Sequence, residues 1–317
     1  MDVLGIDISK ADFHCCLIQN GQRHKRSFPN VPTGARQLRT WLRNRKCERV
    51  HACMEATGAY WSGLATALYD AGMVVSVVNP SRTAFFARSQ LRRTKTDLVD
   101  CAMIADFAVT QNPATWSPPA QEIVELRGFL TYRDHLMCQQ IRIKHVITQV
   151  HAGKALLAFH ARELDHVQQS IKALDAQLAA LLEQQQHLKE QVNNLTAVKG
   201  IGTLTALSII AKLPVDRLRD GKAAAAYVGL TPRERQSGTS LHAHPRISKI
   251  GNASLRRDLY MPALVAMRYN PIIMEFSARL AASGKKPKVI IVAVMRKLIV
   301  LAYTILTRGL VTQLNAA

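Results

Sequence analysis

The sequence lacks a membrane-length apolar run and a paired cysteine motif. No uninterrupted apolar stretch reaches the roughly 18 residues of a membrane-spanning helix. The closest stretch, residues 289–306, is broken by Arg296 and Lys297. The first residues read directly as a strand, so we expect no signal peptide. The six cysteines form no C-x-x-C pair and no zinc-finger spacing, and several stand in apolar segments. We therefore expect a reduced, cytoplasmic protein without membrane contact, whose cysteines are small core residues.

Acidic residues are also scarce. The chain has 22 Asp and Glu against 42 Lys and Arg, which gives a net charge of +20 over 317 residues. The positive excess is spread over the whole chain and is not confined to a tail, which favours nucleic acid as the partner. The plainer alternative is a merely soluble basic protein. The hydrophobic content of 48% is enough for a core, and the length allows two domains with a connecting element.

Residues 1–120 alternate between strand and helix patterns and predict an α/β domain. Leu38 and Trp41 mark one amphipathic helix, and Leu64 and Leu68 mark the next. The order of three early strands, helix, strand, helix, strand, helix is that of a ribonuclease-H-like domain. Functional residues of such sheets stand at the carboxyl ends of the parallel strands. The strand-like runs are residues 2–8, 13–19, 50–55 and 73–79.

Glycine and proline are nearly absent from residues 121–195, which follow a proline-rich break at 113–119. Apolar residues in this segment step by three and four along a heptad seam, interrupted at Gln185, where a polar residue could set the register. The pattern favours a coiled-coil linker and with it a self-associating protein. An amphipathic helix in an ordinary bundle is the alternative. The seam consists of Leu164, Val167, Ile171, Leu174, Leu178, Leu181, Leu188, Val192 and Leu195.

Residues 196–317 predict a third, mostly helical domain. Its opening segment, residues 200–202 (Gly-Ile-Gly), resembles the turn of a helix-hairpin-helix, whose backbone amides bind phosphate. Further on, Ser237, Ser240 and Ser248 stand among arginines, lysines, histidines and glycines. Serine hydroxyls in such surroundings suit a nucleophile that attacks phosphate. A serine is otherwise most often a loop or cap residue.

Four acidic residues, Asp7, Glu55, Asp97 and Asp100, predict a metal site. Asp7 lies inside one apolar run and Glu55 ends another, and a carboxylate there is costly to bury without compensation. Asp97 and Asp100 are three apart, so a helix places both on one face. A single D-x-x-D motif usually only marks a solvated helix face. Carboxylate oxygens are the ligands of hard divalent cations, and two such ions about 3.5–4 Å apart orient and neutralise a phosphodiester.

Two basic clusters accompany these acids. Either cluster could hold a nucleic-acid backbone, and neither indicates that base sequence is read. A charge run is otherwise only a solvated face. One cluster precedes Asp97 and consists of Arg82, Arg88, Arg92, Arg93 and Lys95; the other consists of Arg23, Lys25, Arg26 and the run from Arg36 to Arg49.

Short motifs are distributed along nearly the whole chain. They are Gly5-Ile6-Asp7, Glu55-Ala56-Thr57-Gly58, Asn79-Pro80, Lys95-Thr96-Asp97-x-x-Asp100, Gly200-Ile201-Gly202, Gly229-Leu230-Thr231-Pro232-Arg233, Ser237-Gly238 and Ile247-Ser248-Lys249-x-Gly251-Asn252. Together they resemble the DEDD-type transposases of bacterial insertion sequences, the group that includes bridge-RNA-guided recombinases and related DNA invertases.

The resemblance implies a RuvC-like, ribonuclease-H-like N-terminal domain, a coiled-coil linker and a mostly helical C-terminal transposase domain. Asp7, Glu55, Asp97 and Asp100 would be ligands of Mg²⁺ or Mn²⁺. By its position after the Thr-Pro-Arg segment, Ser237 would be the nucleophile that forms a covalent phosphoserine link to DNA, with Ser240 and Ser248 left open.

The resemblance also implies partners. The enzyme would cleave and rejoin double-stranded donor and target DNA, guided by a structured bridge RNA, by analogy with other guided systems. Homodimers would assemble into a tetramer with an active site shared between subunits. Such an enzyme would work in the bacterial cytoplasm at the nucleoid.

Three other functions compete with a recombinase. In a RuvC-like endonuclease or junction resolvase, water attacks the phosphate and Ser237 is structural. A non-catalytic assembly protein binds RNA or DNA and needs none of the four acids. An actin-fold sugar or acetate kinase shares the Gly-Ile-Asp opening, but the later glycine-rich phosphate loops are absent from the sequence and its pI is about 10.1.

Overall fold

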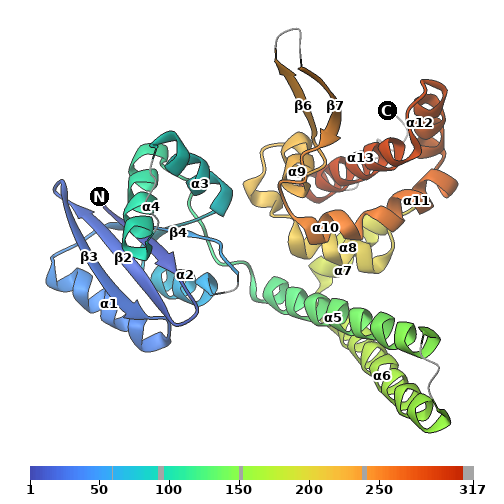
Figure 1. Cartoon of the computed structure of the whole chain (residues 1–317), viewed down its shortest axis with the longest axis horizontal. Helices are drawn as coiled ribbons and strands as arrows, with labels where there is room; N and C mark the ends of the chain where they lie inside the picture. The colour runs from blue at the N-terminus through green and yellow to red at the C-terminus, as the bar shows by residue number, and fades with distance from the viewer. Residues whose placement is uncertain (59, 92–95, 150–152, 238–240, 310–317) are drawn as a thin grey trace. The chain divides into compact units, whose positions relative to one another are not determined.

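A computed structural model describes residues 1–58, 60–91, 96–149, 153–237 and 241–309 (Figure 1). The side chains of residues 149, 154 and 234–246 are outside this description. The chain forms two compact units, Met1–Pro119 and Ala120–Ala317. The predicted helical segment and the predicted C-terminal domain both lie in the second unit.

The first unit is built on a mixed sheet in the order β3-β2-β1-β4-β5. The first three strands are antiparallel neighbours, and β4 and β5 run parallel to β1. This is the ribonuclease-H-like order that the sequence predicts. The strands are β1 (Asp2–Ile8), β2 (Asp12–Gln19), β3 (Gln22–Pro29), β4 (Val50–Glu55) and β5 (Val74–Val78).

Alternation along β1 separates the two faces of the sheet. Leu4 and Ile6 point to the face covered by α1 (Pro32–Asn44) and α2 (Trp61–Asp70). Gly5 and Asp7 point to the opposite face, where α4 (Asp97–Gln111) lies beside α3 (Pro80–Ser89) (Figure 1). A Cβ on Gly5 would lie 2.2 Å from the carbonyl oxygen of Cys101, so α4 can approach this strand only at a glycine. The glycine thus brings the start of α4 close to Asp7.

The proline-rich segment after α4 covers one edge of the sheet. The backbone amide of Trp116 donates to the carbonyl of Val75 at 2.6 Å. The hydroxyl of Ser76 donates to the carbonyls of Pro113 and Ala114 at 3.0 and 2.9 Å. This segment is therefore part of the first unit and not a loose linker.

The cysteines are free, as expected of a reduced protein. Cys15, Cys16, Cys53 and Cys101 are buried in the first unit, which agrees with their prediction as small core residues. Cys138 is the exception, because it is exposed on α5.

The second unit begins with a helical hairpin of α5 (Gln121–Gln149) and α6 (Lys154–Gln184) (Figure 1). Seam residues of α6 such as Ile171, Leu174 and Leu178 are buried, and they pack on α5 residues that include Leu130 and Leu136. The heptad seam is therefore filled from within the same chain, so it does not by itself require a second copy. Periodicity reveals an apolar stripe but not the helix that covers it.

Gln185 has a structural role different from the predicted one. It lies between α6 and α7 (Gln186–Thr196) with φ −115° and ψ 85°, outside the helical region. The polar residue therefore marks the end of a helix and does not set the register of a continuous seam.

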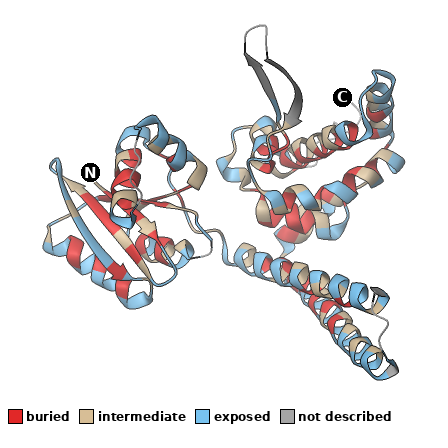
Figure 2. Cartoon of the chain, in the orientation of Figure 1, coloured by how far each residue is buried: buried red, intermediate tan, exposed pale blue. Residues whose placement is uncertain are grey.

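The rest of the second unit packs around α13 (Pro287–Arg308), whose Val294, Leu298 and Ala302 are fully buried (Figure 2). By length and composition this helix could cross a membrane, but half of its apolar window is buried in this core. It therefore reads as the core helix of the unit. The remaining elements are α8 (Thr203–Lys212), η1 (Val215–Arg217), α9 (Gly221–Val228), β6 (Pro232–Ser237), β7 (Leu241–Ile247), α10 (Ala253–Asp258), α11 (Tyr260–Tyr269) and α12 (Pro271–Ala282).

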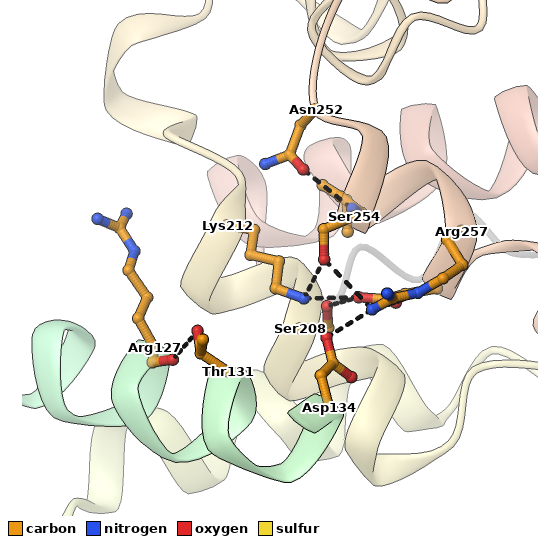
Figure 3. A network of polar contacts seen from close by, with 10 residues as sticks. Arg127, Thr131, Asp134, Ser208, Lys212, Asn252, Ser254 and Arg257 are labelled. Carbon is orange, nitrogen blue, oxygen red and sulfur yellow. Dashed lines mark hydrogen bonds and ion pairs between the residues drawn. The ribbon is translucent and has the colours of Figure 1, made fainter. Parts of the chain in front are cut away.

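A polar network ties the hairpin to this core (Figure 3). Lys212 of α8 donates to Asp258 of α10 at 2.7 Å, and Ser208 donates to the same carboxylate at 2.6 Å. Arg257 pairs with Asp258 and with Asp134 of α5. Since α5, α8 and α10 share one network, the base of the hairpin is fixed to the helices that follow it.

Candidate functional site

Asp7 and Glu55 end neighbouring parallel strands. Asp7 is the penultimate residue of β1, and Glu55 is the last residue of β4. Since Ile6 lies opposite Met54 in the parallel register, the next residues, Asp7 and Glu55, stand side by side at the carboxyl edge of the sheet. The sequence predicts this placement.

Asp97 and Asp100 lie in the first turn of α4. The amide of Asp100 donates to the carbonyl of Thr96, the N-cap residue, at 2.8 Å. Acidic residues are favoured there by the positive end of the helix dipole. Asp100 is half-buried, whereas the Asp97 side chain is 69% exposed.

The pKa of Asp7 indicates that the other three acids lie near it. Burial, followed by the charges of Asp100, Glu55 and Asp97, raises the pKa of Asp7 from 3.8 to about 6. The nearby His14 acts in the opposite direction. A carboxyl group shifted in this way lies among other negative charges in a partly dry site, and a bound cation would relieve that repulsion.

The donor set fits a hard divalent cation, because carboxylate oxygens are the ligands that such ions prefer. Within the described residues, no three His, Cys, Asp or Glu groups are already arranged to hold a metal ion. The fit therefore rests on donor chemistry and on the mutual repulsion at Asp7. Asp7, Glu55, Asp97 and Asp100 are the residues that would hold the ion.

Two residues that the sequence reasoning missed contact these acids. The hydroxyl of Thr83 on α3 is fully buried and donates to Glu55 Oε1 at 2.5 Å. On β2, the ring of His14 lies 3.5 Å from Asp97 Oδ2. Only Thr83 had a usable signal in the sequence, because Asn79-Pro80 marks a helix start and places Thr83 in its first turn.

The basic cluster before Asp97 is only partly described. Arg82 lies over the ring of Phe107, with 5.3 Å from the guanidinium carbon to the ring centroid, and Arg88 lies over Phe85 at 6.0 Å. Arg82 therefore bridges α3 and α4 on the face that carries Asp7, whereas the contact of Arg88 stays within α3. Arg92, Arg93 and Lys95 fall outside the described residues.

The backbone places Ser237 at the end of β6, opposite Leu241 in the β6–β7 hairpin. Its side chain and all of Ser240 fall outside the described residues. Ser248 follows β7, and its hydroxyl accepts from the amide of Ile250 at 3.1 Å, which is the behaviour of a turn residue. Ser237 belongs to the second compact unit and the four acids belong to the first.

Two of the predicted motifs build the base of this hairpin. Gly229 ends α9 with φ 77°, and Gly251 has φ 140°, where a Cβ would lie 2.2 Å from the carbonyl oxygen of Tyr227. The amide of Asn252 donates to that carbonyl at 2.8 Å, and the amide of Lys249 donates to the carbonyl of Gly229 at 3.2 Å. The glycines thus allow two chain segments to cross closely where the hairpin begins.

The Gly-Ile-Gly turn before α8 has a packing role. Gly200 has φ 113°, and a Cβ there would lie 2.6 Å from that of Ala266 on α11. The side-chain amide of Asn270 donates to the carbonyl of Lys199 at 3.2 Å. Phosphate binding by this turn stays a prediction.

The mixed sheet with its acidic edge, followed by the helical unit, is the arrangement of a DEDD transposase. A family model for DEDD transposases, described as "Transposase", matches residues 4–152. A second model, described as "Transposase IS116/IS110/IS902 family", matches residues 192–278. The protein is thus a DNA-cleaving and DNA-joining enzyme with a RuvC-like DEDD domain.

Whole proteins resemble the chain nearly end to end. The pilin gene-inverting protein of Moraxella bovis is 32% identical over 311 residues, which cover 96% of each chain. A probable family 20 transposase of Pseudomonas aeruginosa is 24% identical over 295 residues, 83% of this chain and 81% of that protein. Among solved structures, Thermus RuvC in complex with a Holliday junction substrate ("T. thermophilus RuvC") covers 36% of this chain at 15% identity, with a TM-score of 0.28. The chain belongs to the IS116/IS110/IS902 family of transposases.

Proposed function

We propose that the protein is a recombinase that cleaves and rejoins double-stranded DNA, with Ser237 as the nucleophile and Asp7, Glu55, Asp97 and Asp100 as ligands of Mg²⁺ or Mn²⁺. The observation that carries the proposal is geometric: Asp7 and Glu55 end neighbouring strands, and the first turn of α4, with Asp97 and Asp100, packs on the same face of the sheet. That convergence is expected of a site built for a cation and is unusual on a solvated surface.

The four carboxylates and Ser237 would have different roles in the reaction. The four carboxylates would orient the ion, which when bound would neutralise the negative charge of the phosphodiester. Ser237 Oγ would attack the phosphorus, and the P–O bond to one strand end would break. That strand end would take up the proton that the serine loses and depart as a free hydroxyl. The P–O bond to DNA is exchanged for a P–O bond to serine, so the reverse attack by a strand hydroxyl can rejoin the DNA. A water nucleophile would leave cut ends.

The assembly follows from the same proposal. The active site would be composite, as the family resemblance implies, with Ser237 from one subunit and the four acids from another. The protein would act as a homodimer that assembles into a tetramer. A structured bridge RNA would direct it to donor and target DNA, and it would work in the bacterial cytoplasm at the nucleoid. The related pilin gene-inverting protein suggests that inversion of a DNA segment is one possible outcome of the same chemistry.

The test is a cleavage assay with trapping of the protein–DNA adduct. Ser237→Ala should abolish both cleavage and the adduct, whereas Ser248→Ala should retain both, because Ser248 is bound within a turn. Asp7→Asn should reduce cleavage by at least about 100-fold, since it removes a ligand of the ion.

Three results would count against the proposal. Undiminished cutting by Ser237→Ala would favour water as the nucleophile and thus a resolvase. An adduct mapped to Ser240 or Ser248 would show that this serine, and not Ser237, is the nucleophile. Full activity of Asp7→Asn would remove the metal site.

A further inference from the structure

His14 lies in the middle of a row that crosses the sheet. It stands opposite Asp7 of β1 on one side and opposite Ser27 of β3 on the other. Its Nδ1 lies 2.6 Å from Ser27 Oγ, and its Nε2 lies 3.5 Å from Asp97 Oδ2 and 3.7 Å from Asp12 Oδ1. One ring nitrogen is therefore held by an edge strand while the other faces an acid of the candidate site.

Asp97 is the exposed member of the four acids. It is the first residue of α4, and the N-cap residue Thr96 makes no side-chain capping hydrogen bond. In the described ranges of the chain, His14 is the one side chain within ion-pair distance of the Asp97 carboxylate. The His14 side chain is only 16% exposed and Asp97 is 69% exposed, so the fixed group is the histidine. A carboxylate free to rotate loses more conformational entropy when it binds an ion.

We propose that His14 is a positioning residue that turns the Asp97 carboxylate toward Asp7, Glu55 and Asp100. The inference rests on the proposed function, because it takes these four acids to be the ligands of a divalent ion. A single neutral tautomer satisfies both contacts of the ring. With the proton on Nε2 facing Asp97, Nδ1 accepts a hydrogen bond from the Ser27 hydroxyl. Partners of this kind orient metal ligands in many proteins.

The proposed role differs chemically from that of a ligand. A ligand needs a lone pair on the ring nitrogen, whereas positioning needs an N–H group directed at Asp97. Glutamine supplies an N–H group of similar reach, so His14→Gln should retain the positioning role. Alanine has no side-chain N–H group, so His14→Ala should lose the positioning role.

The experiment is a Mn²⁺ titration of the full chain, followed by calorimetry or by the spin resonance of free Mn²⁺. His14→Ala should weaken Mn²⁺ binding by about 10-fold or more, the usual effect of losing such a partner. His14→Gln should bind close to the unaltered protein. Ser27 is exposed, so Ser27→Ala should fold normally and still weaken binding, because the ring is released.

His51→Gln is the matched control. His51 is also bonded to a serine in this sheet, with 2.8 Å between its Nε2 and Ser76 Oγ, but it stands near the start of β4, away from Glu55 at the end. This variant should lower the melting temperature and leave Mn²⁺ affinity unchanged.

Unchanged Mn²⁺ affinity in both His14→Ala and Ser27→Ala would overturn the proposal. A His14→Gln variant as weak as His14→Ala would also overturn it and would make the ring a ligand. Asp7→Asn separates this failure from that of the proposed function. If Asp7→Asn also binds Mn²⁺ normally, the metal site itself is wrong and the role of His14 falls with it.

Discussion

Asp258 shows how a single side chain couples folding to pH. Burial disfavours its charged form, but hydrogen bonds from Lys212 and Ser208 and the charge of Lys212 outweigh burial, so its pKa lies below the usual 3.8. A carboxyl group with a lowered folded-state pKa stabilises the fold above its unfolded pKa. That contribution is lost as the pH falls below about 4.

Asp258→Asn should therefore destabilise the protein at pH 7 by about 3 kcal/mol, because it leaves Lys212 buried without its partner charge. Urea unfolding at pH 7 and pH 3 measures the effect, and the difference between variant and unaltered protein should shrink at pH 3. Asp216→Asn is the control, since Asp216 is 71% exposed in its pair with Arg217 and should cost below about 1 kcal/mol. An equal loss at both pH values would contradict this account.

Single residues also show what the sequence can and cannot predict. The strand-end positions of Asp7 and Glu55 follow from apolar runs, and the spacing of Asp97 and Asp100 follows from helix periodicity, so both were predictable. His14 was not, because its contacts depend on the register of β1, β2 and β3. Register is set by the packed sheet and is not visible in a strand taken alone.

Among the elements, α1 has the most one-sided surface. Its inner side packs Leu38, Trp41 and Leu42 on the sheet, and its outer side exposes Arg36, Arg39 and Arg43. The helix carries no acidic residue, and in the part of the chain that the structure describes these arginines form no ion pair. They lie on the face of the sheet opposite Asp7. We therefore expect them to hold a stretch of duplex DNA other than the one that is cut.

Replacing Arg36, Arg39 and Arg43 together by Gln should reduce the slope of log affinity against log salt by about 3 for a duplex of random sequence. Binding isotherms at several salt concentrations measure this slope. Arg219→Gln is the control, because Arg219 is exposed but paired with Asp220. A slope that stays the same in the triple variant would remove α1 from the DNA interface.

Two strand regions could not be located from local sequence, for one cause. The predicted order includes a third early strand, but no apolar run marks it, because β3 has the sequence QRHKRSFP and forms where β2 pairs along it. The β6–β7 hairpin is similarly polar and was absent from the prediction of a mostly helical domain. In both cases pairing with a neighbouring strand outweighs local composition.

At the scale of the whole molecule, the α5–α6 hairpin has a buried seam that stabilises the fold and an exposed outer surface that can contact another copy. Its seam is buried inside the chain and is not available to a second copy, whereas the outer surface exposes Ile141 of α5 and Phe159 of α6 at 56% and 62%. We expect an oligomer to use this outer surface. The sequence revealed the apolar stripe of α6, but it predicted neither the break at Gln185 nor the helix α5 that covers the stripe.

Leu174→Ala should cost about 2–5 kcal/mol of stability, because it removes a buried side chain between α5 and α6. Ile141→Ser with Phe159→Ser should leave stability nearly unchanged and shift the protein to a smaller assembly. Thermal unfolding measures the first effect, and light scattering coupled to size-exclusion chromatography measures the second. An unaltered mass of the double variant would show that the subunits meet elsewhere.

The two edges of the N-terminal sheet have a consequence for how copies of this protein can meet. At one edge, β5 is already bonded to the segment around Trp116. At the other edge, β3 exposes Lys25 and Arg26, and a second copy of that strand would bring these like charges together. Both edges therefore disfavour pairing with another strand. Copies of the protein that cluster on DNA at high local concentration are thereby protected against joining into a continuous intermolecular sheet.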